Sequence, residues 1–274
     1  MQTYAQRKTL SIGERVLTGF PFPLTVSELA YRSGTMTDLD QNRVYQSNKL
    51  IEASYSLTLN EKRLVLYAAS LMDSKKAAPA DGHVNVTVED FANVFGMDLS
   101  KRGDVYNTLK EAVERLYERD ITRYVYEHGK EPEKQTMRWI YYKNYKDGEG
   151  RLVIGFSPTV LPYLTLLERE FTGFKLKNIS ALTSFNAFRI YELTVQYLKF
   201  GTRTFDLAKL RELLQMETKY PNVKDFRRYV LDSSVAEVNQ RTDLELEYEP
   251  IRKGRAISGF KFSIKKNAQI PLHV

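Results

Sequence analysis

Basic residues gather between positions 219 and 230, and this is the part of the sequence best suited to bind a polyanion. An arginine guanidinium can donate two hydrogen bonds to O6 and N7 of one guanine, which a lysine cannot reproduce. The stretch therefore predicts contacts to DNA, base edges included. A solvated helix face with no ligand is the alternative interpretation. The basic residues are Lys219, Lys224, Arg227 and Arg228, and the only acid among them is Asp225.

Smaller groups of basic residues could meet the DNA backbone. One group surrounds Gly254 between two predicted strands, so it lies at a hairpin tip that can reach phosphates or the minor groove. The same tip could equally serve to prevent edge-to-edge aggregation. A single arginine precedes a helix of the second half, and two basic residues open a helix of the first half. In that order, the groups are Arg252, Lys253 and Arg255; Arg203; and Lys101 with Arg102.

Residues for enzyme chemistry are scarce in this sequence. It contains no cysteine, and its three histidines, His83, His128 and His273, are far apart. A phosphate-binding loop of the form GxxxxGK[ST] is absent. The sequence therefore predicts no catalytic residue, no metal site and no cofactor. The 18 tyrosines leave a tyrosine nucleophile open, but a DNA-nicking enzyme usually also needs clustered histidines to hold its metal ion.

Composition predicts a folded protein of two domains. The chain has 274 residues, of which 42% are hydrophobic and 27% charged, and its net charge is +7. A chain of that length is too long for a single small hydrophobic core and is typical of two domains. No stretch approaches the roughly 20 consecutive apolar residues of a membrane span, and the absence of cysteine is compatible with a reducing compartment. We therefore expect a cytoplasmic protein without a membrane segment.

Hydrophobic spacing predicts an α+β fold in which one order of elements occurs twice. The order is helix, strand, helix, helix and hairpin. In the first half it covers a helix at 57–72, a strand at 84–88, helices at 88–95 and 99–119, and strands at 121–126, 136–145 and 151–156. In the second half it covers a helix at 185–201, a strand at 202–205, helices at 207–214 and 221–239, and strands at 244–249 and 257–264.

The two halves can be aligned by a fixed offset. Adding 119 to Val88, Phe91, Phe95 and Met97 gives Leu207, Leu210, Leu214 and Met216, and adding 122 to Leu109, Val113 and Leu116 gives Leu231, Val235 and Val238. A turn between the two helices can absorb the difference of three residues. The alternative is that any two pairs of helices align at some offset.

Three helices followed by a hairpin form the winged helix-turn-helix, whose third helix enters the major groove. Residues 180–267 hold 16 basic and 11 acidic residues, so the second half carries most of the positive charge and is the better DNA reader. We therefore predict two tandem winged-helix domains related by an internal repeat. Their bounds are 43–170 and 171–267, between an N-terminal extension at 1–42 and a C-terminal tail at 268–274.

Three stretches of the sequence resemble a known family. They are Val44 to Ala53 (VYQSNKLIEA), Leu57 to Leu64 (LTLNEKRL) and Tyr220 to Leu231 (YPNVKDFRRYVL). On these stretches the chain is similar to the iteron-binding initiators of theta-type plasmid replication, of the RepE, RepA and π type. The resemblance covers roughly residues 43 to 266. Its third stretch lies on the predicted helix at 221–239, the helix whose basic residues predict DNA contacts.

The resemblance implies that the second domain supplies the main major-groove contacts to repeated origin sequences, the iterons, in duplex DNA. The first domain would supply contacts to the DNA backbone and mediate dimerisation. A homodimer in equilibrium with a monomer is then expected, with monomers initiating replication and dimers repressing the protein's own gene. The host initiator and the replicative helicase are the implied protein partners.

Two other classes of protein remain open on the sequence. A transcriptional regulator with tandem winged helices would carry the same basic helix but would bind a promoter operator. A DNA-nicking enzyme would cleave a strand in the presence of a divalent metal.

Overall fold

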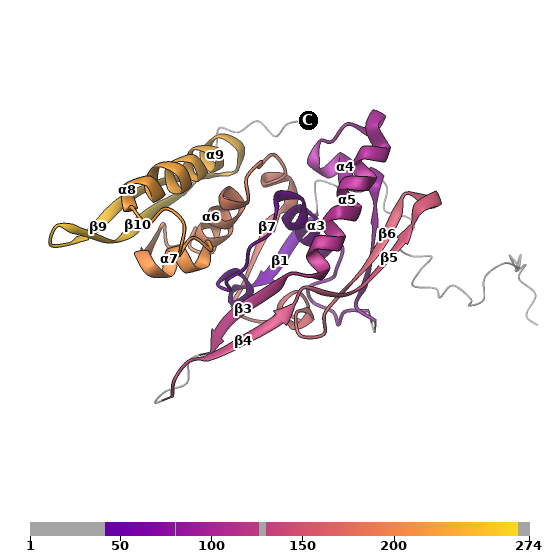
Figure 1. The fold of residues 1–274 in the computed structure, drawn as a ribbon, viewed down its shortest axis with the longest axis horizontal. Coiled ribbons are helices and arrows are strands. Elements are labelled where there is room, and N and C mark those ends of the chain that lie inside the picture. Colours follow the sequence, from indigo (N-terminus) through magenta and orange to yellow (C-terminus); the bar gives the residue numbers. More distant parts are fainter. Residues whose placement is uncertain (1–41, 80, 126–129, 268–274) are drawn as a thin grey trace, which may run out of the picture. The chain divides into compact units, whose positions relative to one another are not determined.

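The first half contains the expected order of elements, together with a strand and a short helix before it and a strand after it that the sequence did not predict. In a computed structural model, residues 42–79, 81–125 and 130–267 are described (Figure 1). The predicted extension at 1–42, except Asn42, and the predicted tail at 268–274 lie outside these residues. The elements are β1 (Arg43–Ser47), α2 (Asn48–Ile51), α3 (Leu59–Ser70), β2 (His83–Thr87), α4 (Val88–Phe95), α5 (Arg102–Tyr117), β3 (Asp120–Val125), β4 (Glu133–Arg138), β5 (Ile140–Lys146), β6 (Arg151–Phe156) and β7 (Phe171–Lys175).

The second half repeats this order with a longer hairpin, whose strands have 10 and 11 residues against 7 and 6 for β5 and β6. Its elements are α6 (Phe185–Val195), β8 (Thr202–Asp206), α7 (Leu207–Leu213), α8 (Val223–Phe226), a π-helical segment (Arg227–Asp232), α9 (Ser233–Arg241), β9 (Leu244–Lys253) and β10 (Ala256–Lys266). Antiparallel pairing builds a three-stranded sheet in each half, in the order β2-β6-β5 and β8-β10-β9. Each sheet lies beside the helices of its own half (Figure 1).

The predicted repeat extends to backbone details. All seven pairs of aligned apolar residues lie in the core or pack against it. Thr87 and Asp206, which are 119 positions apart, both cap the helix that follows with their side chains. The helix also ends alike in both halves, because Gly96 has a φ of 61° and its counterpart Gln215 has a φ of 55°. A left-handed backbone conformation is easiest for glycine to adopt. Because Gln215 adopts it although it is not a glycine, the two halves share the geometry of this turn.

One predicted strand is divided in the structure. The sequence predicts a single strand at 136–145, but β4 pairs with β3 and β5 pairs with β6. Trp139 separates β4 from β5 and is fully buried, with its ring edge-on to Tyr55 at 5.0 Å between centroids. Burial of this large side chain turns the strand between two sheets, which an alternating sequence pattern does not reveal.

Strand β7 pairs with β1 rather than with strands of the second half. The register joins Arg43 to Lys175 and Ser47 to Phe171. The pairing therefore crosses the predicted boundary between residues 170 and 171, and that boundary stays a prediction.

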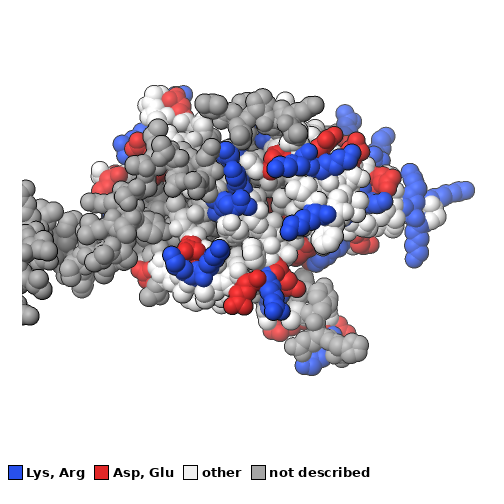
Figure 2. All heavy atoms as spheres, turned by 180° about the vertical axis from the view of Figure 1, so that it is seen from behind, with Lys and Arg blue, Asp and Glu red and all other residues white. Residues whose placement is uncertain are grey.

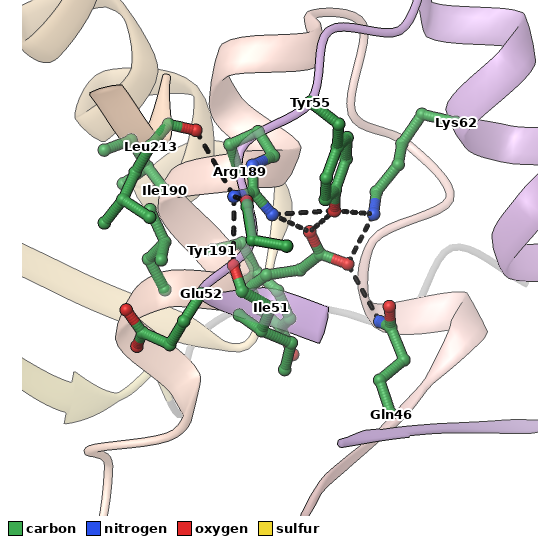
Figure 3. Close-up of polar contacts among 12 residues, drawn as sticks. Gln46, Ile51, Glu52, Tyr55, Lys62, Arg189, Ile190, Tyr191 and Leu213 are labelled. Atoms are coloured by element: carbon green, nitrogen blue, oxygen red, sulfur yellow. Dashed lines mark hydrogen bonds and ion pairs between the residues drawn. The ribbon is translucent and has the colours of Figure 1, made fainter. Parts of the chain in front are cut away.

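A buried cluster of polar and charged residues, which we call the Glu192 network, connects β1 and α3 to α6 (Figure 3). The Nζ atom of Lys62 lies 2.6 Å from Glu192 Oε1 and 2.9 Å from the Tyr55 hydroxyl. Gln46 donates to the same carboxylate at 2.9 Å, and Arg189 lies 3.3 Å from its other oxygen. All five side chains are almost entirely inaccessible to solvent. Buried charges of this kind are tolerated because each is paired and hydrogen-bonded.

Residues next to this network join α2 to the second half of the chain. Arg189 donates to the carbonyl oxygens of Ile51 and Ala53, both at 2.9 Å (Figure 3). Ser54 donates to the carbonyl oxygen of Glu212 at 2.7 Å. The first of the three stretches that carry the family resemblance therefore lies at this junction, where it holds the fold together.

Candidate nucleic-acid interface

The third helix of the second half covers residues 223–241 and is called the reader helix below. Asn222 caps its start by accepting a hydrogen bond from the Lys224 amide at 2.8 Å. The preceding turn is held by Arg211, which donates to the carbonyl oxygens of Lys219 at 2.9 Å and Tyr220 at 2.7 Å. The guanidinium of Arg211 also lies over the ring of Phe226. This buried arginine fixes where the reader helix begins.

The predicted DNA-binding residues on the reader helix differ in how exposed their side chains are. Phe226 and Val230 are completely buried, so one face belongs to the core. Lys224 and Arg228, four residues apart, are both exposed. Arg227 is half-buried between these faces, with its guanidinium 5.8 Å from the ring centroid of Tyr248 on β9. Of the three basic residues predicted to meet DNA from this helix, Lys224 and Arg228 are therefore the two whose side chains are exposed.

Two exposed tyrosines beside Arg228 were missed by the sequence analysis. Tyr229 is 52% exposed, and its ring stacks on that of Tyr220 with centroids 5.8 Å apart. The guanidinium carbon of Arg228 lies 5.3 Å from the ring centroid of Tyr229, within the range of a cation–π contact. The adjacent Arg228 and Tyr229, on the helix whose basic residues predict DNA contacts, could have indicated these tyrosines from the sequence.

The hairpin of β9 and β10, called the wing below, has its basic residues at the tip. Lys253 pairs with Ala256, which leaves Gly254 and Arg255 as the turn. Gly254 has a φ of 63°, a conformation that suits glycine in a two-residue hairpin turn. Arg252, Lys253 and Arg255 are all exposed. In Figure 2, Lys and Arg side chains project from this tip, at the right of the view. The predicted hairpin and its basic tip are therefore present.

Arg203, which the sequence predicts to contact a phosphate, is buried inside the protein in the structure. Its side chain is only 8% exposed. The guanidinium donates to the carbonyl oxygen of Leu193 and to the carboxylate of Glu52, and it lies 4.1 Å from the Phe205 ring centroid. Because these internal groups occupy the guanidinium, the placement corrects the sequence-based role: Arg203 supports the junction rather than a DNA surface.

Lys101 and Arg102 lie at the start of α5, and both are exposed. Further along, α5 is tied to its own hairpin, since Tyr145 of β5 donates to Glu114 at 2.7 Å. Tyr106 similarly donates to Asp147 at 2.6 Å, and burial together with this carboxylate raises the pKa of Tyr106 to about 12. These acids offset the basic residues of the first half, so its third helix offers a polyanion less charge than the reader helix does.

Of the ten predicted site residues, the structure leaves eight exposed. They are Lys101, Arg102, Lys219, Lys224, Arg228, Arg252, Lys253 and Arg255. Within residues 42–79, 81–125 and 130–267, no group of three or more His, Asp or Glu residues is arranged to hold a metal ion. The same residues form no helix both long and apolar enough to cross a membrane.

Comparisons with known proteins agree with this architecture. The family model described as "Initiator Replication protein, WH1" matches residues 43–195, and "Initiator Rep protein, WH2" matches residues 206–264. An uncharacterized 27.6 kDa protein of Escherichia coli is 26% identical over 232 residues, which is 81% of this chain and 93% of the relative. The PI protein of Escherichia coli is 24% identical over 263 residues, which is 84% and 85% of the two chains.

A solved structure has the same fold. The crystal structure of the Pi initiator protein in complex with iteron DNA matches with a TM-score of 0.67 at 23% identity. The match covers 84% of this chain and 99% of that chain. The α+β fold with two winged-helix domains, predicted from the sequence, is thereby confirmed.

Proposed function

Because this chain belongs to the Rep3 family of initiator replication proteins, we propose that it binds repeated origin sequences, iterons, in duplex DNA and so initiates replication. The observation that carries this proposal is the reader helix, which exposes Lys224 and Arg228 from a capped and fixed start. A protein with the same fold was crystallised with iteron DNA, which supports the proposal.

Each group of basic residues has a separate part in the proposed complex. The reader helix enters the major groove, where Arg228 binds a base edge and Lys224 lies beside it. Lys219 and the wing residues Arg252, Lys253 and Arg255 contact phosphates or the minor groove. Lys101 and Arg102 contact the DNA backbone from the first half. Arg227 touches DNA only at the edge of this surface, since its side chain is half-buried.

We also propose the finer functions that the family resemblance implies. The protein acts in the cytoplasm by binding alone, with no catalytic residue, metal or cofactor. Monomers initiate replication and recruit the host initiator and replicative helicase. Dimers form through the first domain and repress the protein's own gene.

Footprinting of the DNA that flanks the gene tests the proposed function. We expect protection of direct repeats, because each copy of a repeated sequence would bind one chain. A chain that uses both domains should protect two major-groove segments about one helical turn, ~34 Å, apart. Replacing Lys101 and Arg102 together by alanine should shorten each footprint at one end. Protection of a single operator at a promoter, with no repeats, would favour the transcriptional regulator instead.

Arg228→Ala and Arg255→Ala form a matched pair that separates base reading from phosphate contact. Arg228→Ala should lose about 1–3 kcal/mol of discrimination at one base pair, since a bidentate contact to guanine is removed. Arg255→Ala should weaken binding to all duplexes alike. Affinities for the protected duplex, its single-base variants and a random duplex give both quantities. Equal weakening on every duplex by Arg228→Ala would show that this residue contacts phosphate only.

A further inference from the structure

The reader helix changes its hydrogen-bonding pattern at Arg227. It is α-helical over Val223–Phe226, π-helical over Arg227–Asp232 and α-helical again from Ser233. A π-helical turn accommodates one more residue than an α-helical turn, and each residue of an α-helix advances by about 100° around the axis. Residues before the wide turn are therefore rotated by roughly that angle relative to a continuous α-helix. The π-helical segment thus sets the direction of Lys224, which precedes it, and of Arg228, which is its second residue.

Side chains at both ends of the π-helical segment meet the same tyrosine of the wing. Tyr248 donates its hydroxyl hydrogen to Oδ1 of Asp232, the last residue of the segment. The guanidinium of Arg227, the first residue, lies 5.8 Å from the centroid of the Tyr248 ring, and interaction with Tyr248 raises the pKa of Arg227. Two residues five positions apart would lie about 140° apart on an α-helix, but the i to i+5 spacing of a π-helix brings them to one side.

The position of Tyr248 is itself fixed by the sheet. Tyr248 pairs with Phe262 in the β9–β10 register, and the two rings stack with centroids 5.4 Å apart. The ring of Phe260 meets it edge-on at 5.5 Å. Burial and the hydrogen bond to Asp232 raise the pKa of Tyr248, so its hydroxyl stays protonated and remains a donor at neutral pH. A rigid donor on the sheet therefore faces the adaptable turn of the helix.

We propose that Tyr248 is a positioning residue for sequence recognition. Its hydroxyl, through Asp232, and its ring, beside Arg227, hold the π-helical turn and thereby point Lys224 and Arg228 at the bases. Tyr248 acts without touching DNA. The inference rests on the proposed function, because it names a residue that sets the specificity of the same DNA site.

Tyr248→Phe tests this inference, because it removes the hydroxyl and keeps the ring. The measured quantity is the ratio of affinities for the duplex protected in the footprint and for a random duplex of equal length. We expect this ratio to fall about 5- to 100-fold, in the range of one lost base contact. Affinity for the random duplex and the salt dependence of binding should stay unchanged, because they report phosphate contacts. Asp232→Ala should lower the ratio equally, and the double variant should lower it no further.

Tyr145→Phe is the matched control, since Tyr145 ties the hairpin of the first half to α5 through Glu114. It should leave the affinity ratio unchanged. A wild-type ratio retained by Tyr248→Phe, with the same melting temperature, would overturn the inference. A reduced salt dependence would also overturn it, by showing that the hydroxyl contacts phosphate. If the wild-type chain itself binds both duplexes equally, the proposed function fails, which is a separate result.

Discussion

Replacing Glu192 by glutamine is expected to lower the free energy of unfolding by about 3–5 kcal/mol. The variant keeps the shape of the side chain but removes the negative charge that faces both Lys62 and Arg189. Two buried cations then lose their only charged partner in the Glu192 network, and their desolvation is no longer offset. Urea denaturation of the wild-type and variant chains measures the difference.

Glu111→Gln is the matched control for this change. Glu111 pairs with Arg115 at 3.5 Å on the surface of α5, where both side chains are more than half exposed. Surface pairs contribute about 0–1 kcal/mol, so this variant should unfold almost as the wild type does. Equal stabilities of the Glu192 and Glu111 variants would show that the Glu192 network contributes no more than a surface pair.

The contribution of Glu192 also has an expected pH dependence. Burial by itself would raise the pKa of this carboxyl, but Lys62 and Arg189, with hydrogen bonds from Lys62 and Gln46, hold it below its ordinary value. A depressed pKa in the folded state means that the unfolded chain binds the proton more readily. The stabilisation is therefore fully present above the unfolded pKa, about 4.3, and is lost as the pH falls through the folded pKa. The difference between wild type and Glu192→Gln should shrink only in that acidic range.

Affinity for duplex DNA is expected to fall by roughly 10³- to 10⁵-fold between 50 and 200 mM salt, if about 6 to 10 phosphates are neutralised. Eight predicted site residues are exposed, and six of them are assigned to the DNA backbone or the minor groove, which corresponds to the lower end of this range. Titration of a labelled duplex at several salt concentrations measures the slope. Arg255→Ala should reduce the slope by about one.

Lys76→Ala provides the control for the salt titration. Lys76 is 80% exposed and paired with Asp73 at 2.9 Å, outside every group of basic residues assigned to DNA. Its removal changes the net charge as Arg255→Ala does but should leave the slope intact. Equal changes of slope in both variants would mean that net charge, rather than the wing tip, governs binding.

Local sequence patterns predicted the repeat well because the helix signals are local. Thr58 illustrates this: its side chain accepts from the Glu61 amide, and Glu61 accepts from the Thr58 amide at 2.9 Å, as the spacing of the two residues predicts. The start of α7 at Leu207, directly after its cap Asp206, is likewise set by neighbouring residues.

Side chains whose partners lie far away in sequence could not be placed from such patterns. Arg203 reads as a surface cation until Glu52, 151 positions away, is seen to accept its hydrogen bond. Arg227 has helical spacing with Lys224 and Arg228, yet Tyr248 draws it against the sheet. The clustering of basic residues thus predicted which part of the chain forms the candidate DNA-binding surface. Tertiary packing determined which of those side chains remain exposed.

The pairing of β1 with β7 has a consequence for the order in which the protein forms on the ribosome. Synthesis runs from the N-terminus, so β1 is made long before Phe171–Lys175, the strand that completes its sheet. Lys62 and Gln46 cannot form their contacts with Glu192 until even later, when Glu192 leaves the exit tunnel. Such distant contacts close slowly, because a long loop must be ordered first. The nascent first domain is therefore open to chaperones, and to premature association with other nascent chains, until α6 of the second half has been translated.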